Sequence, residues 1–331
     1  MLQVKNLKTQ FKTQYKNQTA NVLAVDNVSF SLKQGQTLAL VGESGCGKSV
    51  TALSLMNLIP APGKIIGGEV LFNQQNLLAL SDRELQQIRG KKISMIFQEP
   101  SSALNPVLTC GHQISQVLKL HFSDLSKQQI AERTFSMLKK VGISSPETRM
   151  KEYPHQLSGG MKQRIMIAMS LICQPEILIA DEPTTALDVT IQAQILDIIK
   201  QLQQQYKTSL LLITHDLGVV SEMADQVLVM YAGKVVESNS AKNIFTEPKH
   251  PYTKGLLKSV LGLENFDIHD RCRRLPAIRG MVPSLENLPQ GCRFSDRCDY
   301  AQAQCQQRQP EWQATENENS GFSCFYPESV R

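Results

Sequence analysis

Apolar positions along the chain alternate between the two-residue period of a strand and the longer period of a helix. Near the N-terminus, 2–11 and 22–32 have strand character, and the polar stretch 12–21 between them is predicted to be a loop. Further strands are predicted over 37–41, 70–72, 92–97, 174–182, 209–214, 227–230 and 234–237. Helical periodicity covers 49–58, about 100–172 and 189–205. This alternation predicts an α/β fold.

The pattern changes near residue 265, where prolines, polar residues and cysteines replace the periodic apolar positions. We therefore predict a main domain over 1–264, with a helical part at about 100–172, and a C-terminal extension over 265–331. With 41% hydrophobic and 20% charged residues among 331, the chain has the composition of a globular protein with ample core.

Charge and hydropathy limit the partners and the cellular location that we expect. A net charge of +5 without a block of like charges gives no reason to expect nucleic acid as a partner. Residues 1–18 are polar and basic and lack the apolar run of a secretory signal. No apolar run approaches the ~18 residues that a membrane span needs. We expect a cytosolic protein whose membrane contacts come through partners.

A glycine-rich loop carries the first chemical signal. Residues 42–49 read G-E-S-G-C-G-K-S, which fits G-x-x-x-x-G-K-[ST] between a predicted strand and a predicted helix. Glycines let backbone N–H groups turn toward phosphate oxygens, Lys48 can reach the β- and γ-phosphates, and Ser49 can ligate Mg²⁺. The loop predicts ATP or GTP binding through Gly42, Ser44, Gly45, Cys46, Gly47, Lys48, Ser49 and Val50.

Two adjacent acids follow the apolar run 177–180. Asp181, at the end of a predicted buried strand, can hold Mg²⁺ through water, as in a Walker B motif. Glu182 points elsewhere in the pleat and can act as the general base that activates a water molecule. The pair predicts hydrolysis of the bound nucleotide.

The stretch 157–164, L-S-G-G-M-K-Q-R, precedes a predicted helix. Ser158, Gly159 and Gly160 at a helix N-terminus form a second anion site. Since the chain already has its own phosphate loop, a second site suggests that ATP is sandwiched between two subunits. The stretch resembles the signature sequence of ATP-binding cassette (ABC) ATPases, in which the signature of one subunit caps the γ-phosphate bound by the other.

Three further positions resemble functional positions of that family. Gln98 matches the Q-loop glutamine, which senses Mg²⁺ and the attacking water and links to the membrane subunits. His215 matches the switch histidine, which bonds the γ-phosphate, and Asp188, in 186–188, matches the D-loop. The family also stacks adenine on an early aromatic residue, for which Phe11 and Tyr15 are the candidates. The resemblance implies a P-loop NTPase fold of the ABC type, with a RecA-like core, an antiparallel β subdomain and an α-helical subdomain.

The stretches 97–106, 184–196 and 250–257 resemble the ATPases of bacterial dipeptide, oligopeptide and nickel importers. The resemblance implies a peripheral ATPase on the cytoplasmic face of the inner membrane that powers peptide import. It implies as partners a homologous ATPase subunit in a heterodimer, two permease subunits, and a periplasmic or lipid-anchored solute-binding protein. Alternatives are import of nickel or another small solute, or a soluble ABC protein that acts on nucleic acid or ribosomes.

Four cysteines gather in the C-terminal extension, and a reducing cytosol disfavours disulfides between them. The gaps between Cys292, Cys298, Cys305 and Cys324 match neither a zinc knuckle nor a ferredoxin spacing, so spacing alone does not decide their role. Some members of the resembled group carry a [4Fe–4S] cluster on such a tail. The expectation is a cluster on these four thiolates, with zinc or free thiols as the alternatives.

Overall fold

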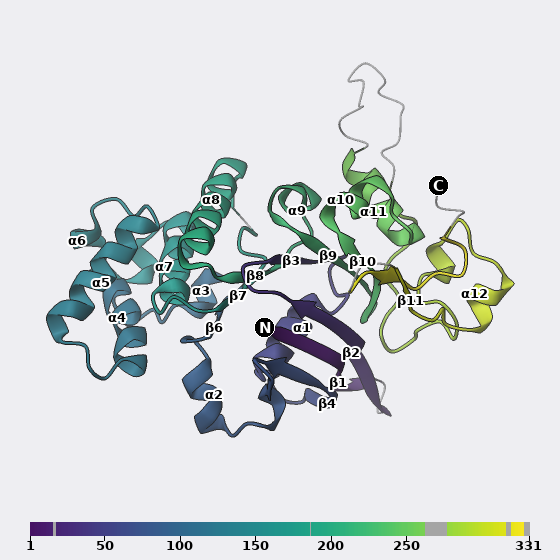
Figure 1. Ribbon diagram of the computed structural model, residues 1–331, viewed down its shortest axis with the longest axis horizontal. Coiled ribbons are helices and arrows are strands. Elements are labelled where there is room, and N and C mark those ends of the chain that lie inside the picture. The colour runs from purple at the N-terminus through teal and green to yellow at the C-terminus, as the bar shows by residue number, and fades with distance from the viewer. Residues whose placement is uncertain (16–17, 186, 262–276, 316–318, 328–331) are drawn as a thin grey trace, which may run out of the picture. The chain divides into compact units, whose positions relative to one another are not determined.

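The computed structural model describes residues 1–15, 18–185, 187–261, 277–315 and 319–327 (Figure 1). The chain forms two compact units. The first comprises Met1–Leu32, Thr37–Leu78 and Thr214–Arg331, and the second comprises Lys33–Gln36 and Ala79–Ile213. The predicted boundary at 264/265 lies outside the described residues, and the division at that point stays a prediction.

An antiparallel sheet opens the first unit, in the strand order β2-β1-β4-β5. Its strands are β1 (Leu2–Tyr15), β2 (Gln18–Leu32), β4 (Lys64–Phe72) and β5 (Gln75–Asn76). The predicted loop over 12–21 is wrong, because β1 and β2 continue as a hairpin in which Lys12 pairs with Asn21 and Thr13 with Ala20. Backbone hydrogen bonds hold such a ladder without apolar side chains, and threonine favours strands.

The second sheet of the first unit has the order β11-β12-β10-β9-β3. Its strands are β3 (Thr37–Val41), β9 (Gln226–Tyr231), β10 (Lys234–Ser240), β11 (Gln313–Ala314) and β12 (Gly321–Phe322). β3 and β9 are parallel, whereas β10 runs antiparallel to β9 and to β12. The C-terminal residues therefore extend the sheet, which their lack of periodicity did not predict.

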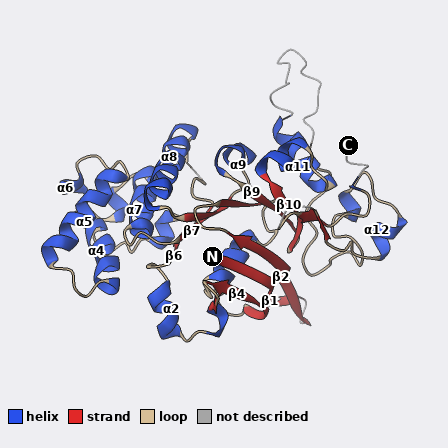
Figure 2. Ribbon diagram, in the orientation of Figure 1, coloured by secondary structure: helices blue, strands red, loops and turns tan. Residues whose placement is uncertain are grey.

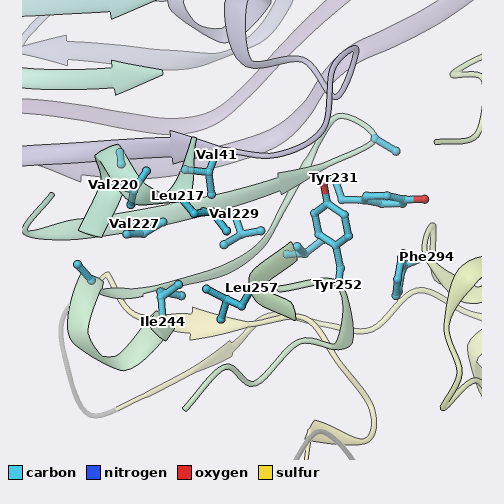
Figure 3. Close-up of a cluster of buried hydrophobic side chains, with 14 residues drawn as sticks. Val41, Leu217, Val220, Val227, Val229, Tyr231, Ile244, Tyr252, Leu257 and Phe294 are labelled. Carbon is cyan, nitrogen blue, oxygen red and sulfur yellow. The ribbon is translucent and has the colours of Figure 1, made fainter. Parts of the chain in front are cut away.

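Helices and a hydrophobic core complete this unit. The helices are α1 (Lys48–Leu55), α9 (Leu217–Met223), α10 (Ala241–Thr246), α11 (Pro251–Leu261) and α12 (Ala303–Gln307), with a 3₁₀ turn, η3, at Ser295–Arg297. Figure 3 shows part of the core, where Val41 and Val229 of the sheet belong to one cluster with Val220 of α9. Phe294 of the C-terminal tail joins the same cluster, so the tail shares the core of the first unit.

The second unit combines three parallel strands with helices (Figure 2). The strands β6 (Ile93–Ile96), β7 (Ile177–Asp181) and β8 (Ser209–Ile213) lie in that order and are buried along their length. The helices are α2 (Asp82–Ile88), α3 (Pro100–Ala103), α4 (Cys110–His121), α5 (Lys127–Lys140), α6 (Pro146–Arg149), α7 (Gly159–Leu171) and α8 (Val189–Tyr206). Two 3₁₀ turns, η1 (Leu77–Ala79) and η2 (Pro154–Gln156), complete the element order. Both faces of a parallel sheet are covered by other elements, so its strands consist of continuous apolar runs. Such runs in the sequence predicted these three strands.

Candidate nucleotide site and cysteine cavity

The phosphate loop follows β3 and ends in α1, as predicted. Gly42 and Gly47 have φ values of 152° and 106°, in the region that favours glycine. A Cβ atom on Gly42 would lie 2.2 Å from the Met230 carbonyl oxygen, and one on Gly47 would lie 2.3 Å from that of Ala24. Only glycine fits at these two positions, so the loop conformation depends on them.

Lys48 is the first residue of α1 and is buried, with 5% of its surface exposed. Its Nζ donates to the carbonyl oxygens of Gly42, at 2.8 Å, and of Glu43, at 3.1 Å. The ammonium therefore lies within the curve of the loop, where phosphate oxygens would compete with these two carbonyls. Ser49 and Val50 continue the first turn of α1, where N–H groups and the helix dipole favour an anion.

Ser44 and Gly45 are exposed on the loop, whereas Cys46 is fully buried. Burial raises the pKa of the Cys46 thiol, and the carbonyl oxygen of Cys46 accepts a hydrogen bond from the Gly233 N–H at 2.8 Å. Cys46 is thus a small packed residue that ties the loop to the turn between β9 and β10. All eight predicted ATP-binding residues lie on this loop and the first turn of α1.

His215 belongs to the first unit, whose last segment begins one residue earlier, at Thr214. The histidine is exposed. The following residue, Asp216, caps α9 by accepting from the N–H groups of Gly218, at 2.8 Å, and Val219, at 3.3 Å. The cap fixes the backbone next to the histidine. The predicted γ-phosphate contact of His215 stays a prediction.

The predicted base lies in the second unit. Asp181 is the last residue of β7 and is 4% exposed, and Glu182 follows with a positive φ of 46°. The Oε2 atom of Glu182 accepts from Gln98 Nε2 at 3.0 Å and from Thr185 Oγ1 at 2.8 Å. A left-handed backbone at a non-glycine residue costs about 1–3 kcal/mol and is concentrated at functional sites. Two of the predicted site residues, Gln98 and Glu182, are thus in direct contact.

The signature serine caps α7. Ser158 Oγ accepts from the Met161 N–H at 3.4 Å, and both Ser158 and Gly159 are exposed. One turn into α7, Gln163 donates to the Pro183 carbonyl oxygen at 2.5 Å, which ties the helix to the segment after Glu182. An exposed helix N-terminus is open to an anion carried by another molecule.

The D-loop aspartate caps the next long helix. Asp188 Oδ1 accepts from the Ile191 N–H at 3.1 Å at the start of α8. Ala186 of the predicted D-loop lies outside the described residues. Of the two adenine candidates, Phe11 packs on Gly63, where an added Cβ would lie 2.5 Å from its ring, and the side chain of Tyr15 lies outside the described residues.

The four cysteines of the tail line one cavity in the first unit. Most of the rest of its wall is aromatic or apolar: the cavity is lined by Cys292, Cys298, Cys305 and Cys324 together with Phe294, Tyr300, Phe325, Tyr326, His250, Pro251, Ser295 and Pro310. Burial, with the neighbouring thiols, raises the pKa of Cys292 to about 11 and that of Cys324 to about 12. Among the described residues, no group of three or more histidine, cysteine or acidic side chains is arranged to hold a single metal ion.

Three residues of these sites were not predicted from the sequence. Thr185 bonds Glu182, while Tyr252 and Arg297 both bond Glu43 of the phosphate loop. Tyr252 and Arg297 follow Glu43 by 209 and 254 residues, so only the fold brings them together. Thr185 stands three residues after Glu182, a spacing at which a hydroxyl can reach back to a carboxylate.

Comparisons with known proteins show the family of the chain. Residues 25–185 match the ABC transporter family, and residues 236–305 match the C-terminal region of oligopeptide/dipeptide transporters. The oligopeptide transport ATP-binding protein AppD of Bacillus subtilis is 50% identical over 94% of this chain and 92% of its own length. The dipeptide transport ATP-binding protein DppD of the same organism is 51% identical over 94% and 90%.

A solved structure shares the fold. The ATP-binding cassette MJ0796, determined as a dimer in a post-hydrolysis state with ADP and Pi, superposes with a TM-score of 0.64 and 28% identity. The match covers 73% of this chain and 99% of that one. Among the described helices of this chain, none has the length and apolar composition of a membrane span. The resemblance found in the sequence is confirmed: the chain belongs to the ABC transporter ATP-binding proteins, in the oligopeptide/dipeptide branch, and has their cassette fold.

Proposed function

We propose that this chain is the ATP-hydrolysing subunit that powers peptide import across a bacterial inner membrane. The observation that carries the proposal is the identity of about half the residues, over 94% of the chain, with oligopeptide and dipeptide transport ATP-binding proteins. Both the cassette and the C-terminal region take part in that similarity. The chain has a phosphate loop and an oriented carboxylate, which are the parts that hydrolysis needs.

In the proposed reaction, the phosphate loop binds ATP and Lys48 moves its ammonium from the loop carbonyls to the β- and γ-phosphates. Glu182 takes a proton from the attacking water, and Gln98 and Thr185 hold its carboxylate in place. His215 donates to the γ-phosphate as negative charge develops. Ser49, Gln98 and Asp181 would hold Mg²⁺, which neutralises phosphate charge when bound.

The exposed signature turn supports a dimeric mechanism. Ser158, Gly159 and Gly160 would cap the γ-phosphate held by a homologous ATPase subunit, and Asp188 would lie at the same interface. ATP then holds the two subunits together, and its hydrolysis removes the bridging phosphate. This branch of the family implies two different ATPases, so we propose a heterodimer.

The remaining partners follow from the family. We propose that the chain sits peripherally on the cytoplasmic face of the membrane and contacts two permease subunits, which a solute-binding protein supplies with peptide. The helical region offers exposed apolar side chains for such contacts, with Val107 75% and Leu120 73% exposed. Phe97, just after β6, is 39% exposed. No nucleic acid takes part in this mechanism.

For the tail, we propose a [4Fe–4S] cluster on Cys292, Cys298, Cys305 and Cys324. The four thiols line one cavity, which is the observation that supports the proposal. Burial raises the pKa of Cys292, Cys298 and Cys324, so a bound metal would have to supply the charge that stabilises their thiolates. Zinc, which cysteine sulfurs bind at about 2.3 Å, is one alternative. Free thiols are the remaining alternative. The cluster would order the tail and takes no part in hydrolysis.

Peptide uptake tests the main proposal. A bacterial strain that lacks its own peptide importers would receive this chain with its permease, binding-protein and ATPase partners, and uptake of a labelled dipeptide and a labelled pentapeptide would be measured. We expect uptake that is lost with Lys48→Ala. Uptake of nickel without uptake of either peptide would refute the peptide assignment, and copurification with nucleic acid instead of permeases would refute transport.

Assays of iron, sulfide and zinc in the complex, purified without oxygen, test the proposed cluster. About four irons and four sulfides per subunit, as the proposed cluster formula requires, should be lost with Cys298→Ala and kept with Cys110→Ala, a buried cysteine of α4 outside the cavity. Stoichiometric zinc, or no metal, would refute the cluster and leave the ATPase assignment intact.

A further inference from the structure

The C-terminal tail reaches the phosphate loop through one ion pair. Arg297, the last residue of η3, donates from Nη1 to Glu43 Oε2 at 2.7 Å and from Nη2 to Glu43 Oε1 at 2.9 Å. The two parallel bonds form a bidentate pair, which is among the stronger and most directional interactions between side chains. Glu43 is the second residue of the phosphate loop, so a tail residue holds the loop directly.

Arg297 is itself fixed. Its side chain is 5% exposed, whereas that of Glu43 is 30% exposed. Nε donates to the Arg279 carbonyl oxygen at 2.7 Å, and Nη1 donates to Tyr231 Oη at 3.3 Å. The guanidinium also lies 5.7 Å from the centre of the Tyr231 ring and 5.9 Å from that of Phe294. The arginine is therefore a rigid fork with little freedom to leave the glutamate.

Glu43 is held at three places. Its N–H donates to Tyr252 Oη at 2.8 Å, and its carbonyl oxygen accepts from Lys48 Nζ at 3.1 Å. Arg297 holds its carboxylate. Figure 3 shows Tyr252 beside Tyr231 in the aromatic end of the core, and the two rings lie 4.6 Å apart. The first half of the phosphate loop is thus attached to the core and to the tail at the same residue.

The negative charge of Glu43 opposes the binding of a phosphate group to the loop. A carboxylate in a loop that binds a polyphosphate repels it, and the repulsion is larger near low-dielectric protein than in water. The Arg297 guanidinium stays protonated at physiological pH and cancels that charge at hydrogen-bond distance. Without the arginine, the loop would carry an uncompensated negative charge beside the phosphates.

We propose that Arg297 is a positioning residue for ATP binding, which neutralises Glu43 and fixes it in the phosphate loop. The tail then contributes to the nucleotide site of its own chain through this pair. The inference rests on the proposed use of the loop for ATP, which the affinity of the unchanged chain for ATP tests by itself.

Three variants distinguish neutralisation of the Glu43 charge from a purely structural role of Arg297. We would measure the dissociation constant of Mg-ATP, and KM and kcat in the assembled transporter, for Arg297→Gln, Glu43→Gln and the double variant. We expect Arg297→Gln to raise the dissociation constant and KM about tenfold, more at low salt than at high salt, with kcat changed far less. Glu43→Gln should bind at least as well as the unchanged chain, and the double variant should return to within about twofold of it.

Controls keep the test decisive if Arg297→Gln folds poorly. Arg297→Lys keeps the charge and loses the fork, so its affinity should lie between those of Arg297→Gln and the unchanged chain. Arg308→Gln removes another arginine of the tail, which is exposed and lies 5.3 Å from the centre of the Phe325 ring, and should leave the affinity unchanged. Weak binding by Glu43→Gln, no recovery in the double variant, or an affinity of Arg297→Gln within twofold of normal would overturn the proposal.

Discussion

Gln98 donates a hydrogen bond from Nε2 to Oε2 of Glu182, with 3.0 Å between the two atoms and 84 residues between them in the chain. Both residues follow neighbouring parallel strands, Gln98 after β6 and Glu182 after β7. The carboxyl ends of parallel strands meet at one edge of a sheet, which is where α/β proteins bind their ligands. The amide therefore orients the carboxylate that we propose as the base, and a displacement of the Q-loop would change that orientation.

Replacing the base should uncouple binding from hydrolysis. With Glu182→Gln, we expect kcat to fall about 10²–10⁴-fold, since general base catalysis contributes that much, while ATP affinity is retained. The ATP-bound variant should elute as a closed dimer in size-exclusion chromatography. Glu176→Gln, the same change just before β7, should keep normal turnover. Appreciable hydrolysis by Glu182→Gln would show that another group takes the proton.

The hydroxyl of Thr185 should matter for rate and not for binding. It donates to the same Oε2 atom as Gln98, at 2.8 Å, so Thr185→Val removes this donor at nearly constant volume. A hydrogen bond to a charged group is worth about 1.5–3 kcal/mol, and partial compensation by Gln98 leads us to expect about a tenfold loss in kcat. Steady-state kinetics should show an unchanged KM. A raised KM with normal kcat would mean that Thr185 contacts the nucleotide instead.

Local patterns predicted the elements that carry the nucleotide chemistry. The buried strand 177–181 is a continuous apolar run that ends in its acid, and the loop 42–49 stands between a strand and a helix. In these segments, the residues that determine the structure are neighbours in the chain. The placement of Asp181, Glu182 and Ser158 at element ends could therefore be predicted from the sequence alone.

Long-range contacts could not be predicted in the same way. Arg297 is one arginine among many in a tail without periodicity, and tertiary packing, including that of Phe294 in the core, brings it to Glu43. The pairing of 12–15 with 18–21 was missed because this ladder depends on the partner strand and not on apolar side chains. The fold likewise brings the four cysteines to one cavity. Their spacing in the chain matches no common metal motif and did not predict this arrangement.

The signature serine should have a structural role that is separable from its proposed contact with ATP. Ser158 caps α7, and loss of an N-cap costs about 0.5–2 kcal/mol. Ser158→Ala should therefore lower stability by about 1 kcal/mol, whereas Ser158→Asn should keep the cap and the stability. If the side chain also contacts the partner's ATP, both variants should lose ATPase activity. Denaturant unfolding and ATPase assays on the same samples measure the two effects, and normal activity in both variants would exclude the contact.

A buried histidine should make the stability of the first unit depend on pH. His250 is 2% exposed, its ring Nδ1 accepts from the backbone N–H of Tyr252 at 3.1 Å, and its backbone N–H donates to Glu237 Oε2 at 2.9 Å. Burial lowers the pKa of His250 from 6.5 to about 3. The unfolded chain therefore binds a proton that the folded chain excludes between these two values, so stability falls as pH falls below about 6.5.

The expected size follows from 1.36 kcal/mol for each pKa unit. Between pH 7 and pH 5.5, protonation of His250 in the unfolded chain should remove about 1 kcal/mol of unfolding free energy. Glu237 beside it has a pKa raised by burial and acts in the opposite direction, so the comparison must be with a variant that changes the histidine alone. His250→Asn keeps an acceptor for the Tyr252 N–H and does not titrate. Urea unfolding at the two pH values should show that the unchanged chain loses about 1 kcal/mol more than His250→Asn, and equal losses would mean that His250 is protonated in the folded protein.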